Sequence, residues 1–169
     1  MSKIYFLSVK NFKEEHPIHG NVDVQLLKPS LWRAQEINIQ EAIGSKLYDQ
    51  LEEQIKTSTL TADNTTLLNN YINHALGYYT LSEIIRPMTM QLTNKGLASK
   101  DDQYQTSGNL KEIESMEAFY RTRAEWFAQR LIDFLKANVK LYPKYAESGD
   151  CDDIKPIDNA YTTNIYFPK

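Results

Sequence analysis

The feature that most constrains the fold is a long run of apolar residues at helical spacing near the C-terminal end of the chain. At 3.6 residues per turn, this spacing predicts a single helix of about eight turns, from about Asn109 to Val139, closed by Pro143. A helix of this length must bury its apolar face against other elements, so we expect a mainly α-helical protein. The residues on that face are Leu110, Ile113, Met116, Tyr120, Ala124, Phe127, Leu131, Ile132, Leu135 and Val139.

Three shorter helices are expected before the long one. The first begins at Ser30, an N-cap that directly follows a proline, and ends at Gly44, which readily adopts a left-handed backbone. The second begins at Ser45, so the two helices form a corner. The third runs from about Thr66 until Pro87 ends or kinks it. The fold class is therefore a small bundle of about four helices, whose buried faces include Leu31, Trp32, Ile39, Ala42, Ile43, Leu47, Leu51, Ile55, Leu68, Ile72 and Leu76.

The remaining segments lack a sustained helical pattern. Residues 1–29 are expected to form an N-terminal arm and turn segment, with a possible short strand at 3–9. Residues 30–143 form the helical domain, and residues 144–169 form an extended C-terminal arm. Within the domain, 57–65 is expected to be a polar linker and 92–107 an exposed loop.

Composition and charge exclude several classes of protein. The chain has 169 residues, of which 41% are hydrophobic and 24% charged, as in an ordinary soluble domain. A net charge of -3 argues against tight binding of phosphates, although DNA could pass along such a surface without being retained. Cys151 is the single cysteine, so an intramolecular disulfide is impossible. The N-terminal residues do not resemble a signal peptide, and the sequence predicts neither a membrane span nor export.

The sequence contains no recognisable catalytic, cofactor-binding or metal-binding motif. His16 and His19 have a ligand-like spacing, but they belong to a turn with Pro17 and Gly20 and have no further ligands nearby. His74 is expected to be a packed histidine of the third helix. Cys151 lies among carboxylates, which disfavour its thiolate. We therefore expect no enzyme activity, no cofactor and no metal.

Several apolar residues do not fit the core of a monomer. Phe119 and Trp126 are seven residues apart and lie roughly 60–80° outside the apolar face of the long helix. Ile37 likewise points away from the face of the first helix. Such residues either contact a partner or show that the helix is central and covered on two sides. Short apolar segments also occur near both ends, so the expected interface residues are Ile37, Phe119, Trp126, Ile4, Tyr5, Phe6, Ile165, Tyr166 and Phe167.

The residues around the first predicted corner resemble those of a known family of proteins. Leu31-Trp32-Arg33-Ala34-Gln35-Glu36, Ile39-Gln40 and Ile43-Gly44-Ser45-Lys46-Leu47-Tyr48 with Leu51 resemble head–tail connector proteins of tailed bacteriophages, in particular those of Bacteroidetes and crAss-like phages. The likeness continues through Asn94-Lys95-Gly96, the long helix, and Leu135-Lys136-Ala137-Asn138 with Tyr142-Pro143, and it spans about residues 3–145.

The resemblance implies a structural protein of the virion neck. About a dozen copies would form a ring that docks on the portal protein, extends the DNA channel and contacts further neck or tail proteins. Such a ring would have no catalytic residues, and genomic DNA would pass through its channel without sequence-specific binding. Two other functions remain open: a small helical adaptor or regulator that binds a host or phage protein through Phe119 and Trp126, and an enzyme with an unfamiliar site in the loop 93–109.

Overall fold

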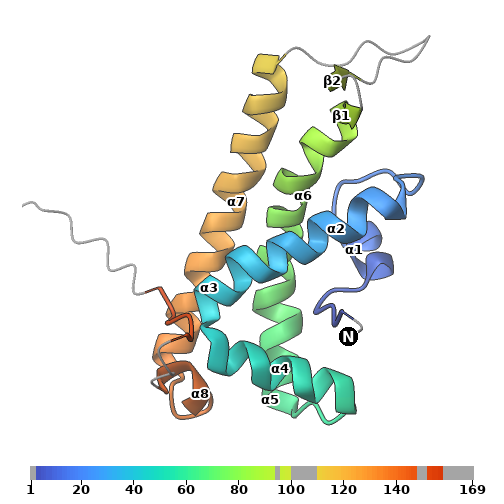
Figure 1. Cartoon of the computed structure of the whole chain (residues 1–169). Helices are drawn as coiled ribbons and strands as arrows, with labels where there is room; N and C mark the ends of the chain where they lie inside the picture. The colour runs from blue at the N-terminus through green and yellow to red at the C-terminus, as the bar shows by residue number, and fades with distance from the viewer. Residues whose placement is uncertain (1–2, 94–95, 100–109, 148–151, 158–169) are drawn as a thin grey trace, which may run out of the picture.

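The computed structural model describes residues 3–93, 96–99, 110–147 and 152–157. Its centre is an antiparallel pair of long helices, α6 (Asn73–Thr89) and α7 (Leu110–Ala137), as Figure 1 shows. A second helical column crosses this pair and consists of α2 (Val24–Ala34), a π-helical turn η1 (Gln35–Ile39) and α3 (Gln40–Ile43). The mainly α-helical bundle with a long C-terminal helix is confirmed.

Shorter elements complete the bundle. Helix α4 (Ser45–Thr57) follows α3 at a corner, and α5 (Ala62–Leu67) continues through a second π-helical turn, η2 (Leu68–Ile72), into α6. Helix α1 (Val9–Glu15) precedes α2, and α8 (Pro143–Ala146) follows α7. An antiparallel hairpin of β1 (Met90–Thr93) and β2 (Gly96–Ser99) extends the end of α6 and pairs Met90 with Ser99 and Thr93 with Gly96.

The corner between α3 and α4 forms where the sequence predicts it. Gly44 ends α3 with φ +78°, a conformation that residues with a Cβ rarely adopt. Ser45 was expected to cap α4, but its hydroxyl instead accepts hydrogen bonds from the Ile154 backbone N–H and the Gln40 side chain. The Ser45 N–H donates to the Ile154 carbonyl at 2.9 Å, so the returning chain satisfies the first turn of α4.

Two helices begin earlier than the sequence predicts. The helix expected from Ser30 begins at Val24, where the Asp23 carboxylate accepts from the Gln25 N–H, and it continues through Pro29. Burial of Leu27 and Leu31, one turn apart, outweighs the one backbone hydrogen bond that Pro29 cannot donate. The helix expected from Thr66 begins at Ala62, capped by Thr61, so half of the expected polar linker is helical.

The chain ends and the loop also differ from expectation. Residues 3–29 contain α1 and the start of α2, where no helix was expected, and α2 crosses the expected domain boundary at residue 29. Pro87 does not end α6, which reaches Thr89 and leads into the hairpin where an exposed loop was expected. Residues 152–157 lie against the corner of α3 and α4, where the Ile157 N–H donates to the Glu41 carbonyl.

Candidate interaction surface

The outer face of α7 carries an exposed ridge of large apolar side chains, which we call the α7 ridge: Met116, Phe119 and Trp126, together with Arg123. Met116, Phe119 and Trp126 are 47%, 46% and 61% exposed. Their spacing of three and seven residues aligns them along one side of the helix. The Arg123 guanidinium lies 3.4 Å from the centre of the Phe119 ring, in a cation–π contact. The ridge therefore presents a mixed aromatic and cationic surface to solvent.

The opposite face of α7 explains why the ridge points outward. Ile113, Ala124 and Leu131 are buried on that face, and Ala124 and Leu131 pack in the core of the bundle. Phe127 lies between the two faces, and its ring stacks against Tyr78 of α6 with centroids 5.2 Å apart. Because α6 already occupies the inner face, no described element remains to cover the ridge. Two aromatic contacts hold it in place on its inner side: Phe119 meets Tyr120, and Trp126 meets Phe127, both edge to face.

Ile37 is also exposed, but it belongs to a different part of the surface. It lies in the middle of the π-helical turn η1 and is 56% exposed. Its neighbour Ile39 is fully buried, as the helical pattern predicts. A π-helical turn contains one more residue than an α-helical turn and shifts the register of the side chains that follow. Ile37 thus lies on η1 and the α7 ridge on α7, so the two exposed apolar sites belong to separate helices.

The N-terminal apolar segment packs on the bundle, so the expectation that the helical body cannot cover it is wrong for Phe6, whereas an interface role of Ile4 and Tyr5 stays a prediction. Phe6 and Leu7 are 7% and 1% exposed, and the Phe6 ring packs 4.9 Å from the Tyr48 ring. Ile4 and Tyr5 are half-buried, and Tyr5 meets the Trp32 ring edge to face. The segment lies on the bundle, which the sequence pattern did not reveal because its covering residues lie far along the chain.

A buried glutamine holds the N-terminal segment in place. The Gln35 amide accepts from the Phe6 N–H at 2.8 Å and donates to the Ile4 carbonyl at 2.9 Å. It also donates to the Tyr48 hydroxyl, which in turn donates to Glu36. Burial is the main cause that raises the pKa of Tyr48, so this phenol stays protonated and acts as a donor. The motif residues Gln35 and Tyr48 thus have a structural role in attaching the N-terminus.

His16 forms a second attachment point of the N-terminal region. Its ring contacts the Phe12 and Tyr78 rings and lies so close to Gly77 of α6 that a Cβ there would be 1.6 Å from Nε2. Burial, with a smaller contribution from the nearby His74, lowers the pKa of His16 to about 4. The ring is therefore neutral at neutral pH, and it occupies space that only a glycine leaves free.

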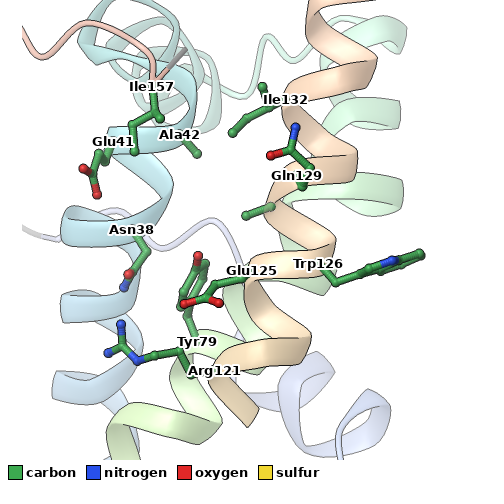
Figure 2. Close-up of a pocket in the computed structure, with 11 residues that line it drawn as sticks. Asn38, Glu41, Ala42, Tyr79, Arg121, Glu125, Trp126, Gln129, Ile132 and Ile157 are labelled. Carbon is green, nitrogen blue, oxygen red and sulfur yellow. The ribbon is translucent and has the colours of Figure 1, made fainter. Parts of the chain in front are cut away.

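A polar pocket of about 460 Å³ separates α7 from η1 and α3. Arg121 and Glu125 extend from α7 toward the helix that carries Asn38 and Glu41, whereas the Trp126 ring extends away from it (Figure 2). Burial is the main cause that raises the pKa of Tyr79 in this pocket to about 12, and Glu125 adds to the rise. The polar lining of the pocket comes from Asn38, Glu41, Tyr79, Arg121, Glu125 and Gln129.

Other expected site residues can be placed only in part. Ile165, Tyr166, Phe167 and Cys151 lie outside the described residues. Among the residues that the structure does describe, no three His, Cys, Asp or Glu side chains gather in a way that could hold a metal ion. None of the helices in these ranges has both the length and the apolar character of a membrane span.

Comparison with known proteins assigns a family without a function. A family model described as a family of unknown function (DUF6712) matches residues 39–155, which is more than half of the chain, so the protein belongs to this family. The match includes the corner after α3, the α6–α7 pair and the α7 ridge. No curated protein and no solved structure matches the chain.

Proposed function

We propose that this member of the DUF6712 family is a head–tail connector subunit of a tailed bacteriophage, which forms a homo-oligomeric ring in the neck of the virion. The observation that carries the proposal is the α7 ridge. Aromatic residues, methionine and arginine are the types enriched at the centres of protein interfaces, and the ridge consists of these types alone. The resemblance of the corner and long-helix motifs to connector proteins points to the ring and its place.

The architecture suits a protein that acts by its shape. The ridge lies on a 28-residue helix whose inner face is part of the core, so it forms a preorganised surface for a partner. A net charge of -3 would let DNA pass through the ring without retention. In this proposal the ring docks on the portal protein, extends its channel and receives the next neck or tail component.

The alternative that the same observation supports is an adaptor or regulator. The α7 ridge would then bind a single host or phage protein, and the chain would remain a monomer by itself. The two functions differ in the stoichiometry of the assembly, which makes them separable by mass.

Native mass spectrometry and negative-stain electron microscopy of the purified chain, alone and mixed with a portal protein from the same source genome, test the proposal. We expect closed rings of uniform mass in one of these samples. A chain that stays monomeric in both would contradict the connector function and favour the adaptor.

A pair of variants connects the ridge to the assembly. We expect Trp126→Asp to abolish ring formation, whereas Leu141→Asp should leave it intact. Leu141 is a matched control because it is 55% exposed, similar to Trp126 at 61%, but lies beyond the end of α7. If Trp126→Asp still forms rings, the ridge does not take part in assembly.

A further inference from the structure

A second pocket lies on another part of the surface, between the N-terminal segment, α2 and α4. We call it the α4 hollow. Its volume is about 810 Å³, within the range of about 300–1,000 Å³ that is usual for ligand-binding pockets. Trp32 and Ile4 give it apolar walls. Three carboxylates, Asp49, Glu52 and Glu53, line its α4 side.

The hollow has an excess of negative charge. Its two cations are already engaged: Lys56 pairs with Glu53 at 3.3 Å, and the Lys3 ammonium lies 4.8 Å from the centre of the Trp32 ring. Burial and the nearby Glu36 and Asp49 raise the pKa of Glu52, which reflects crowding of like charges. An additional cation would relieve this repulsion.

The α7 ridge has the complementary character. Arg123 and Arg130 flank Trp126 at spacings of three and four residues on the same side of the helix. Both arginines are exposed, and each guanidinium lies over an aromatic ring, Phe119 for Arg123 and Tyr71 for Arg130. The ridge is therefore a convex surface with an aromatic centre and cationic sides, and the hollow is concave with an aromatic wall and an acidic rim.

The two surfaces lie far apart on one chain. In Figure 1, α7 forms one edge of the molecule, and the N-terminal segment that borders the hollow lies at the opposite edge. The Trp126 ring points away from the helix of η1 and α3 (Figure 2), and the residues that line the hollow come from the N-terminal segment, α2 and α4. Complementary patches on opposite edges allow a head-to-tail contact between copies, and such contacts generate rings when the rotation closes.

We propose that the α7 ridge of one copy docks into the α4 hollow of the next copy. Trp126 then packs against the neighbour's Trp32, and Arg123 and Arg130 lie beside the neighbour's Asp49, Glu52 and Glu53. This inference rests on the proposed ring function and identifies the two surfaces that build the ring. It also assigns the N-terminal segment an indirect role, because Ile4 forms part of the wall that receives the ridge.

Charge reversal tests the contact on the full-length chain. We expect Arg123→Glu and Asp49→Arg each to reduce the affinity between subunits at least about tenfold, as measured by native mass spectrometry across a concentration series. The double variant R123E/D49R should recover most of the wild-type affinity, because it restores opposite charges across the interface. Lys140→Glu makes the same change of charge as Arg123→Glu at an exposed position outside both surfaces and should have no effect.

Cross-linking tests the direction of the contact. In a Cys151→Ser background, chains with Arg130→Cys are mixed with chains with Asp49→Cys and treated with a short bismaleimide. Head-to-tail packing predicts cross-links between the two kinds of chain in excess over those within either kind. An excess of links between two Arg130→Cys chains would show a two-fold contact and overturn the inference.

The outcomes separate this inference from the proposed function. If the wild type forms rings and the reversals leave them unchanged, or the double variant is not restored, the ring function stands and the ridge-to-hollow contact is wrong. If the wild type stays monomeric alone and with the portal protein, both proposals fail. Circular dichroism of each variant at the assay temperature identifies any loss of assembly that comes from unfolding.

Discussion

Two regions that both carry apolar residues outside the predicted core differ in their burial in the structure. Ile4-Tyr5-Phe6 and the pair Phe119 and Trp126 all lie outside the predicted core, yet Phe6 is 7% exposed and Trp126 is 61% exposed. The N-terminal segment is free to bend toward the bundle, and Gln35 satisfies its backbone. Phe119 and Trp126 are fixed on a helix whose opposite face is already buried. An apolar residue in a segment without helical structure can become buried against the bundle, whereas one on the outer face of a packed helix stays exposed.

The largest effect that this comparison predicts concerns two phenylalanines. Phe6→Ala should lower the free energy of unfolding by about 3–5 kcal/mol, because it leaves a cavity in the core beside Tyr48. Phe119→Ala, which removes the same atoms from the exposed ridge, should lower it by less than about 1 kcal/mol. Urea denaturation followed by circular dichroism measures both. Equal losses would mean that the two regions do not differ in burial in solution.

A single methyl group added at Gly77, beside His16, should destabilise the protein almost as much as Phe6→Ala. Gly77→Ala places a Cβ 1.6 Å from the His16 Nε2, so the ring must move away. We expect a loss of about 2–3 kcal/mol from this overpacking. His16→Ala removes the clash, so the double variant should be more stable than the sum of the two single changes predicts. Additive effects would show that His16 does not lie on Gly77.

The hydrogen bonds of Gln35 should contribute less than the burial of Phe6. Gln35→Leu keeps a side chain of similar size but leaves the Phe6 N–H and the Ile4 carbonyl without their partner. We expect the free energy of unfolding to fall by about 2 kcal/mol. Asn38→Leu is the control in the same π-helical turn, because the Asn38 amide makes one long hydrogen bond of 3.5 Å to the Ala34 carbonyl. Hydrogen exchange should show faster exchange of the Phe6 amide in Gln35→Leu and not in Asn38→Leu.

Acid should weaken the N-terminal attachment through His16. Because its pKa falls from 6.5 to about 4 on folding, the unfolded chain binds the proton first as the pH decreases. The stability that neutral His16 contributes is complete above pH 6.5 and is lost as the pH falls through 6.5 toward 4. Between pH 6.5 and 5 we expect a loss of about 1–2 kcal/mol, because one unit of pH is worth about 1.4 kcal/mol for a group that protonates only in the unfolded chain. His16→Gln should remove this part of the pH dependence in thermal unfolding, and an unchanged profile would assign it to other groups.

The smallest effect on folding should come from the ridge. Trp126→Asp should change the free energy of unfolding by less than about 1 kcal/mol, because the side chain is 61% exposed. Thermal unfolding of the monomeric fraction, isolated at low concentration, measures this change without the contribution of assembly. A grossly unfolded variant would mean that Trp126 belongs to the interior.

The sequence predicted the parts of the fold that depend on neighbouring residues. The spacing of apolar residues predicted the long helix within two residues of its observed ends, Leu110 and Ala137. Gly44 marked the corner because a left-handed backbone favours glycine. Exposure of Ile37, Phe119 and Trp126 followed from the same helical geometry.

Predictions failed where contacts between distant residues outweighed local preferences. Pro29 and Pro87 were expected to limit helices, but α2 and α6 continue through them, and the buried Leu27 and Leu31 hold α2 against the core on both sides of Pro29. The hairpin after α6 was missed because each strand has only four residues, too few for a clear alternating pattern.

What the sequence alone determined is the long helix α7, the side of it that is apolar and the corner at Gly44, because 3.6-residue periodicity and the left-handed preference of glycine are properties of contiguous residues. Only the tertiary structure decided what is covered. Gln35 reaches Phe6 across 29 positions, and Ser45 meets Ile154 across 109. Contacts at such separations leave no periodic signal, because their partners are brought together only when the whole chain packs.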